Sequence, residues 1–369
     1  MAEFLSLSNE LIYLIAQDLT ITDICALLRA KRYLSWLLLP TLHKRALKVK
    51  LKNGMTVLHW ASQNGHLSLA RGLLECGAKI DEEHSWIHRT KVISSKTTAL
   101  HYAADSADDA IVELLLEKGA DVNLKAKLYR ESAIHFATRA RSERCVELLL
   151  EYGADIDAKK KNGTSALQMA ARDGDEGLVR LLLDSGADIH MADHFGCQAL
   201  QYAVENAQTD IVYLLLVKDA DINGGFSAEN RGDTPLYKAV HFGHHDLVET
   251  LIAEGADIAI RNSLGRTALH EAAATGQDAI ARLLVEYGAN VNTRVSSQAL
   301  DSGMTPLLFA ADQGHVDTVG LLIDLGALIN WKDSDGWTAL KMAEHATHGK
   351  VVKLLKEKGA LVLNDDEVS

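Results

Sequence analysis

Apolar residues recur at helical spacing along most of the chain, in short stretches that end at glycine. In one stretch Ile111, Leu114 and Leu115 fall on one side of a helix, and residues 179–183 repeat the arrangement. A shorter apolar stretch precedes each of these and begins after Thr or Ser, residues that cap helix N-termini. Glycine after the second stretch is typical of a helix C-terminus. The pattern predicts pairs of short helices joined by tight turns.

These helix pairs form an internal repeat. Nine segments align: GMTVLHWA from Gly54, KTTALHYA from Lys96, RESAIHFA from Arg130, GTSALQMA from Gly163, GCQALQYA from Gly196, GDTPLYKA from Gly232, GRTALHEA from Gly265, GMTPLLFA from Gly303 and GWTALKMA from Gly336. Successive starts are 42, 34, 33, 33, 36, 33, 38 and 33 residues apart, which gives a base period of 33. The three longest spacings arise from extra residues at 81–95, 222–231 and 293–302.

Residues 51–363, which contain this repeat, resemble the ankyrin repeat family. The resemblance implies an all-α solenoid of nine helix–turn–helix units with β-hairpin fingers, which the three insertions lengthen. It also implies that the histidines of the Thr-x-Leu-His motif form hydrogen bonds within and between units. In the fifth unit Gln198 replaces the capping hydroxyl and Asp219 replaces the closing glycine. We expect that unit to be the least stable.

The segment 1–50 does not fit the repeat. Its apolar spacing predicts three short helices, Asn9–Leu19, Asp23–Ala30 and Lys31–Leu39. The run from Leu5 onward resembles an F-box, as in fungal F-box/ankyrin proteins. The resemblance implies an F-box-like bundle that binds a Skp-family adaptor of a cullin ubiquitin ligase, with these contacts: Leu7, Glu10, Leu11, Ile15 and Leu19. The alternative is a bundle that only caps the solenoid.

Charge narrows the range of partners. The chain of 369 residues has a net charge of −12, and residues 54–369 are more acidic than the whole because the first 53 residues are basic. An acidic body repels nucleic acid and anionic membranes, so we expect neither as a partner, and we expect a basic protein partner instead. Residues 364–369 form a short acidic tail. Because both ends of the repeat array have a cap in this interpretation, we expect a monomer.

No sequence motif indicates catalysis. The chain lacks a phosphate-binding loop, a metalloprotease HExxH and a nucleophile elbow, and its four cysteines lie far apart. We therefore expect no cofactor, no metal and no enzymatic activity. Widely spaced cysteines are typical of a reducing compartment, either cytoplasm or nucleus.

Binding of a target protein is the function that remains. In the family, the residue after the motif's His position faces a concave groove, and here it is apolar or aromatic in most units. From these positions, the finger tips and the longest finger we expect partner contacts: Trp60, Tyr102, Tyr129, Phe136, Met169, Phe195, Tyr202, Phe309, Trp337 and Trp86. The alternative is that these side chains pack against neighbouring units.

Together these observations predict a protein-interaction module that holds its target in the groove as substrate receptor of a cullin-type ubiquitin ligase. Two alternatives stay open. One is an ankyrin scaffold without a ligase link, and the other is an atypical enzyme or small-molecule binder that uses the groove.

Overall fold

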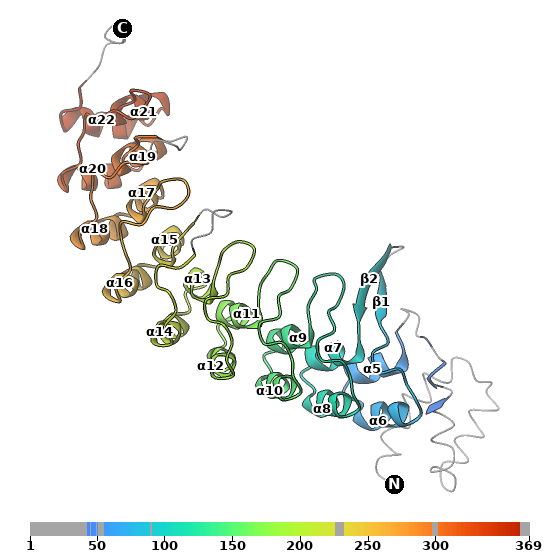
Figure 1. Cartoon of the computed structure of the whole chain (residues 1–369). Coiled ribbons are helices and arrows are strands. Elements are labelled where there is room, and N and C mark those ends of the chain that lie inside the picture. The colour runs from blue at the N-terminus through green and yellow to red at the C-terminus, as the bar shows by residue number, and fades with distance from the viewer. Residues whose placement is uncertain are drawn as a thin grey trace. The chain divides into compact units, whose positions relative to one another are not determined.

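The computed structural model describes residues 43–44, 46–48, 50, 55–88, 91–225, 232–296 and 302–361, with side chains omitted at 85–88 and 91–95 (Figure 1). The helices predicted at Asn9–Leu19, Asp23–Ala30 and Lys31–Leu39 lie outside these residues, and so does the acidic tail.

The described residues contain eighteen helices that form nine consecutive pairs. The first helix of each pair has seven or eight residues: α5 (Val57–Gln63), α7 (Ala99–Asp105), α9 (Ala133–Arg139), α11 (Ala166–Asp173), α13 (Ala199–Glu205), α15 (Pro235–His241), α17 (Ala268–Ala274), α19 (Pro306–Gln313) and α21 (Ala339–His345). The second has nine: α6 (Leu67–Glu75), α8 (Asp109–Glu117), α10 (Glu143–Glu151), α12 (Glu176–Asp184), α14 (Thr209–Val217), α16 (His245–Ala253), α18 (Asp278–Glu286), α20 (Val316–Asp324) and α22 (Gly349–Glu357).

Side-chain caps fix where many of these helices begin. The Thr234 hydroxyl accepts from the backbone N–H of Tyr237 at 3.2 Å, and Pro235 occupies the first helical position, where no donor is lost. At the second helix of a pair, Asp108 accepts from the N–H of Ile111 at 2.9 Å. Such a cap stabilises a helix by about 1 kcal/mol.

A closing glycine in the left-handed conformation follows eight of the nine second helices, for example Gly153 at φ 84°. A Cβ built on Gly153 would meet no atom within 4 Å, so the backbone conformation alone explains the glycine. In the fifth pair Asp219 occupies the same position at φ 64°. An aspartate there is strained, because its Cβ crowds the backbone.

Contacts divide the chain into two compact units. Unit 1 comprises residues 1–170 with 175–188, and unit 2 comprises 171–174 with 189–369. Figure 1 shows that first helices form one row and second helices another within each unit. In unit 1, α5, α7 and α9 pack in sequence, as do α6, α8, α10 and α12. In unit 2 the row of first helices runs from α13 to α21, and α16, α18, α20 and α22 pack in sequence.

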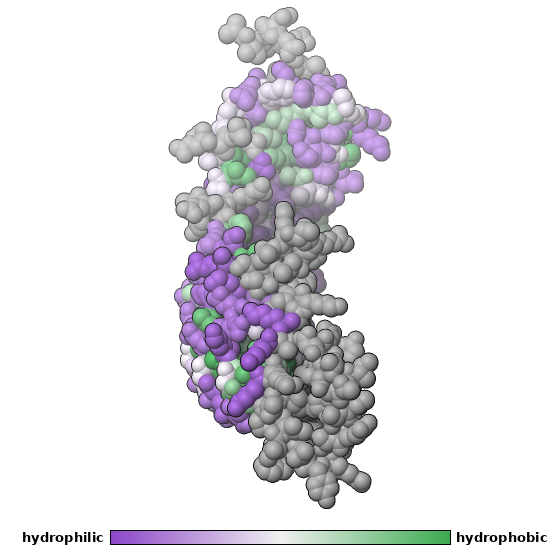
Figure 2. Space-filling view, turned by 90° about the vertical axis from the view of Figure 1, so that its right-hand side faces the viewer, coloured by the Kyte–Doolittle hydropathy of each residue, from purple (hydrophilic) through white to green (hydrophobic). Residues whose placement is uncertain are grey.

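The core lies between the two rows of each unit. Leu100 and Leu149 are buried in unit 1, and Leu251 and Leu322 are buried in unit 2. Polar side chains cover most of the described surface that Figure 2 shows, with small hydrophobic patches between them. None of the described helices has the length and apolar character that crossing a membrane requires.

Asparagine side chains join the closing turns of neighbouring repeats. Asn123 donates from Nδ2 to the carbonyl oxygen of Gly153 at 3.0 Å, and its Oδ1 accepts from the N–H of Asp155 at 2.9 Å. Asn292 forms the same pair of bonds to Gly326 and Leu328, at 3.2 and 2.8 Å. These bonds fix the spacing of successive repeats at the point where each finger begins.

The first insertion forms a β-hairpin, as predicted. Strand β1 (His84–His88) pairs antiparallel with β2 (Lys91–Thr97), and Trp86 lies opposite Ile93. A register shift separates His84 from Trp86. The other two insertions fall partly outside the described residues, at 226–231 and 297–301.

We expect Asp219→Gly to raise the free energy of unfolding by about 0.5–1 kcal/mol, because it removes left-handed strain at one closing turn. Denaturant unfolding of the full chain measures the change. The reverse substitution Gly186→Asp, at a turn with φ 92°, provides the matched comparison and should destabilise the protein. An unchanged or lower stability of Asp219→Gly contradicts the strain argument.

Candidate partner-binding site

In three repeats a polar residue of the motif, His59, His101 or Gln201, bonds to the start of the following finger. In α7 the N–H of Thr98 donates to Nδ1 of His101 at 3.1 Å, so the ring hydrogen is on Nε2, which donates to the carbonyl of Leu124 at 3.1 Å. Gln201 in α13 makes the equivalent bonds, since its Oε1 accepts from the N–H of Gln198 and its Nε2 donates to Gly224. One side chain therefore caps its own helix and holds the next finger.

Burial keeps these histidines neutral. It lowers the pKa of His101 to about 4, and it lowers the pKa of His59 to about 4, against 6.5 for an exposed ring. A neutral ring can accept at Nδ1 while it donates at Nε2, and a protonated ring cannot accept. His59 and His101 therefore have the structural role that the family resemblance implied, whereas Nε2 of the buried His135 and His270 meets no hydrogen-bond partner among the described residues.

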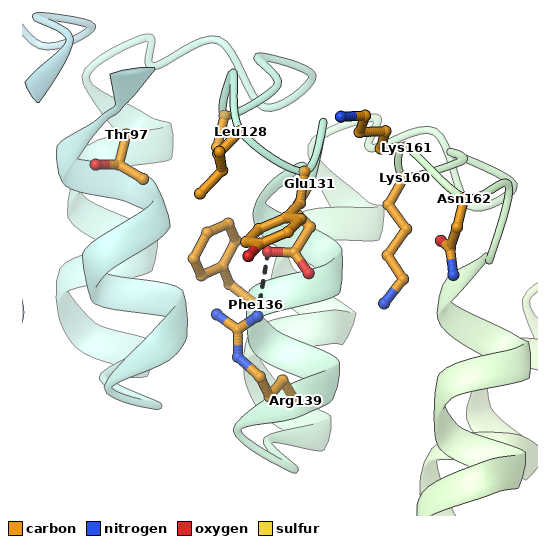
Figure 3. A pocket seen from close by; sticks show the side chains of 10 residues that line it. Thr97, Leu128, Glu131, Phe136, Arg139, Lys160, Lys161 and Asn162 are labelled. Atoms are coloured by element: carbon orange, nitrogen blue, oxygen red, sulfur yellow. Dashed lines mark hydrogen bonds and ion pairs between the residues drawn. The ribbon is translucent and has the colours of Figure 1, made fainter. Parts of the chain in front are cut away.

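A hollow of about 810 Å³, here called the finger pocket, opens in unit 1 between two successive fingers and α9 (Figure 3). Its walls combine apolar, aromatic and basic side chains: Thr97, Ala126, Leu128, Tyr129, Glu131, Phe136, Arg139, Lys160, Lys161 and Asn162. In Figure 3, Lys160 and Asn162 extend from the second finger into the space beside Glu131.

Arg139 and Phe136 form the fixed floor of the finger pocket. The Arg139 guanidinium lies 4.5 Å from the centre of the Phe136 ring, a cation–π arrangement. The same guanidinium donates to Glu131 at 3.2 Å and to Asp105 at 2.9 Å. Both contacts stabilise its cation, and its pKa lies above the ordinary value although burial opposes this. The floor is thus already ordered before any partner binds.

The exposed apolar residues of the finger pocket come from the finger tip. Leu128 is 41% exposed and Tyr129 is 58% exposed, and both line the pocket together with the half-buried ring of Phe136. Large apolar side chains with this exposure are typical of binding surfaces when they lie together. Of the predicted partner contacts, Tyr129 and Phe136 are therefore brought together in one site.

The other predicted contacts of unit 1 lie elsewhere. Trp60 is half-buried and stacks on His66 with ring centres 4.7 Å apart, and the Tyr102 hydroxyl is 2.8 Å from Nδ1 of His84. Trp86 is in β1, and its side chain is not described. Met169 is only 2% exposed, which corrects the expectation that it faces a partner. Its side chain is part of the core.

In unit 2 the predicted contacts also differ in exposure. Phe195 is 58% exposed, whereas the half-buried Tyr202 donates its hydroxyl to Asp193 at 2.6 Å. Trp337 is half-buried and meets His345 edge-on at 5.2 Å. Phe309 is only 5% exposed and packs against His270, so the expectation for Phe309 was also wrong. The predicted adaptor contacts Leu7, Glu10, Leu11, Ile15 and Leu19 lie outside the described residues.

A second hollow of about 530 Å³ lies within unit 2, and its polar groups are paired with one another. The buried carboxylate of Glu271 accepts from the Tyr237 hydroxyl at 2.5 Å and lies 2.6 Å from Nδ1 of His241. Burial, with the nearby Glu271 carboxylate, raises the pKa of Tyr237. Burial raises the pKa of Cys197 to about 11, so its thiol stays protonated at neutral pH and is a poor nucleophile.

Sequence reasoning missed several residues of the finger pocket. Leu128, Glu131, Arg139 and the lysines at 160–161 were not among the predicted contacts. The signal that could have found them is the basic composition of two successive fingers in an acidic chain. The described residues include no group of acidic, His and Cys side chains that could hold a metal ion.

Comparison with known proteins identifies the family. A model described as ankyrin repeats (3 copies) matches the chain in overlapping segments: 24–126, 87–160, 134–225, 200–295 and 293–366. These matches cover most of the chain, which therefore belongs to the ankyrin repeat family. The family is generally non-catalytic and serves in protein–protein interaction. The first match begins at residue 24, within the segment predicted as a separate bundle.

Individual relatives share only part of this chain. An ankyrin repeat protein of Rickettsia bellii is 34% identical over 132 residues, which are 35% of this chain and 70% of that protein. Human BCL-6 corepressor-like protein 1 is 34% identical over 120 residues, which are 32% of this chain and 6% of that protein. The "Probable E3 ubiquitin-protein ligase XBOS32" of Oryza sativa subsp. japonica is 33% identical over 36% of this chain and 32% of its own length.

The buried histidines predict how stability depends on pH. An unfolded histidine titrates near 6.5 and the folded His101 near 4, so the unfolded chain binds more protons between these values. The free energy of unfolding should therefore decrease as the pH is lowered from 7 to 5. In the variant His101→Gln, a glutamine can make the same two bonds that Gln201 makes in α13. We expect this variant to lose about 2 kcal/mol less of that free energy than the unmodified chain.

Denaturant unfolding at the two pH values tests this expectation. A fall of equal size in His101→Gln and the unmodified chain contradicts the assignment of a neutral buried ring.

Proposed function

We propose that this ankyrin repeat protein binds a segment of a partner protein in the finger pocket of unit 1. The observation that carries the proposal is the exposure of Leu128 and Tyr129 beside the fixed pair of Phe136 and Arg139. Aromatic side chains and arginine dominate the binding energy of protein interfaces, especially where the free site is already ordered.

The hollow of unit 2 supports the same role less well. Glu271 already pairs with Tyr237 and His241, and Lys238 lies 3.3 Å from the Glu205 carboxylate. A ligand there would have to replace these contacts, and a buried carboxylate that loses its donors is costly. The finger pocket instead offers apolar surface at Leu128 and Tyr129 that the described residues of unit 1 leave exposed.

Selection of peptides from a random display library on the full chain tests the proposal. We expect enriched peptides whose binding is weakened roughly tenfold by Tyr129→Ser and by Phe136→Ala, because each substitution removes an aromatic contact. Phe195→Ser is the matched control, since Phe195 is a finger residue of unit 2 with the same 58% exposure as Tyr129.

Circular dichroism of each variant provides the control for folding. Peptides that bind the Tyr129→Ser and Phe136→Ala variants as tightly as the unmodified chain would contradict the finger pocket as the binding site.

As the more specific role, we propose a substrate receptor of a cullin-type ubiquitin ligase. Two observations favour it: the F-box resemblance of the N-terminal segment, and the similarity of the repeats to a rice protein named as an E3 ubiquitin-protein ligase. In this role the segment binds a Skp-family adaptor while the finger pocket holds the target. The chain would then act by positioning its target, in the cytoplasm or nucleus.

We expect the full chain to co-elute with a recombinant Skp-family adaptor on a sizing column. Leu11→Asp with Ile15→Asp should abolish this, because two carboxylates on the predicted apolar helix face oppose docking. The control Leu128→Asp changes an exposed apolar residue of the finger pocket and should leave adaptor binding intact. Co-elution of the folded double variant would exclude the predicted adaptor face.

A further inference from the structure

We infer that the finger pocket takes an acidic segment of a partner protein, anchored by one aromatic or large aliphatic side chain. The inference rests on the proposed function and specifies the chemistry of its ligand. It reverses the expectation of a basic partner, which followed from the charge of the whole chain.

The outer parts of the two fingers are basic, although the chain has a net charge of −12 and Asp121, Asp155 and Asp157 lie at the bases of the fingers. Residues 124–131 and 158–163 together contain one acidic residue, Glu131, whose carboxylate already pairs with Arg139. They contain six basic residues: Lys125, Lys127, Arg130, Lys159, Lys160 and Lys161. Five of these are exposed, and Lys160 is half-buried at the pocket wall.

Contacts between the fingers hold them beside one another, and Lys160 and Lys161 line the pocket itself. The backbone N–H of Lys161 on the second finger donates to the carbonyl oxygen of Tyr129 at the tip of the first, at 2.6 Å. Burial lowers the pKa of His135 beneath the fingers, and the positive charges of Lys160 and Lys125 lower it further. Lys160 of the second finger and Lys125 of the first thus both lie close enough to act on one buried ring between the fingers.

The backbone conformation of Arg130 separately indicates that the positive charge of the first finger is functional. It is at φ 54° in the turn position that Gly163, Gly196 and Gly265 occupy in other repeats, also at positive φ. A side chain in this conformation costs about 1–2 kcal/mol relative to glycine. The protein keeps an exposed arginine here at a cost in stability, a pattern typical of functional sites.

The apolar part of the pocket determines the second feature of the ligand. Leu128, Tyr129 and the floor residue Phe136 form the apolar lining, and the volume of about 810 Å³ admits a large side chain with its flanking backbone. Arg139 already has two carboxylate partners, so we assign the attraction of new carboxylates to the exposed Lys125, Lys127 and Arg130. An acidic segment with a central ring or leucine matches both parts.

The direct test is fluorescence anisotropy on the full chain, with a labelled peptide of aspartate and glutamate residues around one tryptophan. We expect binding that weakens when the salt concentration rises from about 50 to about 500 mM. Replacing the tryptophan by alanine, or the acids by lysines, should each weaken it at least roughly tenfold.

Charge reversals in the fingers and elsewhere show whether the affinity for the acidic peptide depends on the finger lysines. Lys125→Glu with Lys127→Glu should weaken the acidic peptide roughly tenfold or more. Lys332→Glu with Lys350→Glu changes the net charge equally at two exposed positions of unit 2 and should change affinity less than twofold. Equal losses in both double variants would mean that only the net charge matters, which overturns the inference.

The variant Arg130→Gly tests whether weaker peptide binding could result from a loss of folding. We expect it to weaken the peptide roughly threefold while the unfolding midpoint rises or stays unchanged, because glycine relieves the strain. Unchanged affinity in this variant would remove Arg130 from the site and contradict its part in the argument.

The outcomes also separate this inference from the proposed function. Display-selected peptides that require Tyr129 but are neutral or basic overturn the acidic ligand and leave the binding site standing. If no peptide depends on Tyr129 or Phe136, both fail. A single-stranded oligonucleotide that binds more tightly than the acidic peptide, and loses binding in the Lys125 and Lys127 double variant, would falsify the peptide ligand in favour of nucleic acid.

Discussion

The rest of this protein depends on one constraint: the apolar faces of its short helices are buried only between neighbouring repeats. Helices of seven and nine residues are too short to be stable alone in water, since nucleation is costly and few hydrogen bonds repay it. Their apolar faces become buried only when α5, α7 and α9 pack in sequence and the second helices do the same. Caps, closing glycines and asparagine bonds refine a structure that this packing first makes possible.

The polar residue of the motif transmits that packing to the binding surface. Because His101 bonds to its own helix N-terminus and to Leu124, the position of a finger depends on the position of a helix. Gln201 does the same in α13. The position therefore requires a side chain that can both donate and accept a hydrogen bond, and it does not require an imidazole. Burial keeps the His101 ring neutral, and both of its nitrogens are engaged in these bonds, so the position is structural.

Charge acts differently at the scale of the chain and of the site. A net charge of −12 repels polyanions at long range, but screening limits such fields to about 8–10 Å at ordinary salt. Within that distance, Lys125 and Lys160 and their neighbours determine what the finger pocket attracts. The side chains of Leu128 and Tyr129 then provide the contact area that long-range attraction cannot.

The sequence by itself determined the repeat, because helical spacing, capping residues and closing glycines are local signals that recur every 33 residues or so. It therefore predicted the helix pairs, the first hairpin and two residues of the finger pocket, Tyr129 and Phe136. Only the tertiary structure decided which side chains are exposed: Met169 and Phe309 occupy the position of Phe136 in their repeats, yet both are buried. Exposure depends on the neighbours across each repeat, which a motif does not specify. Likewise, the basic residues of two fingers became one site only through contacts such as that between Lys161 and Tyr129, over 30 residues apart in sequence.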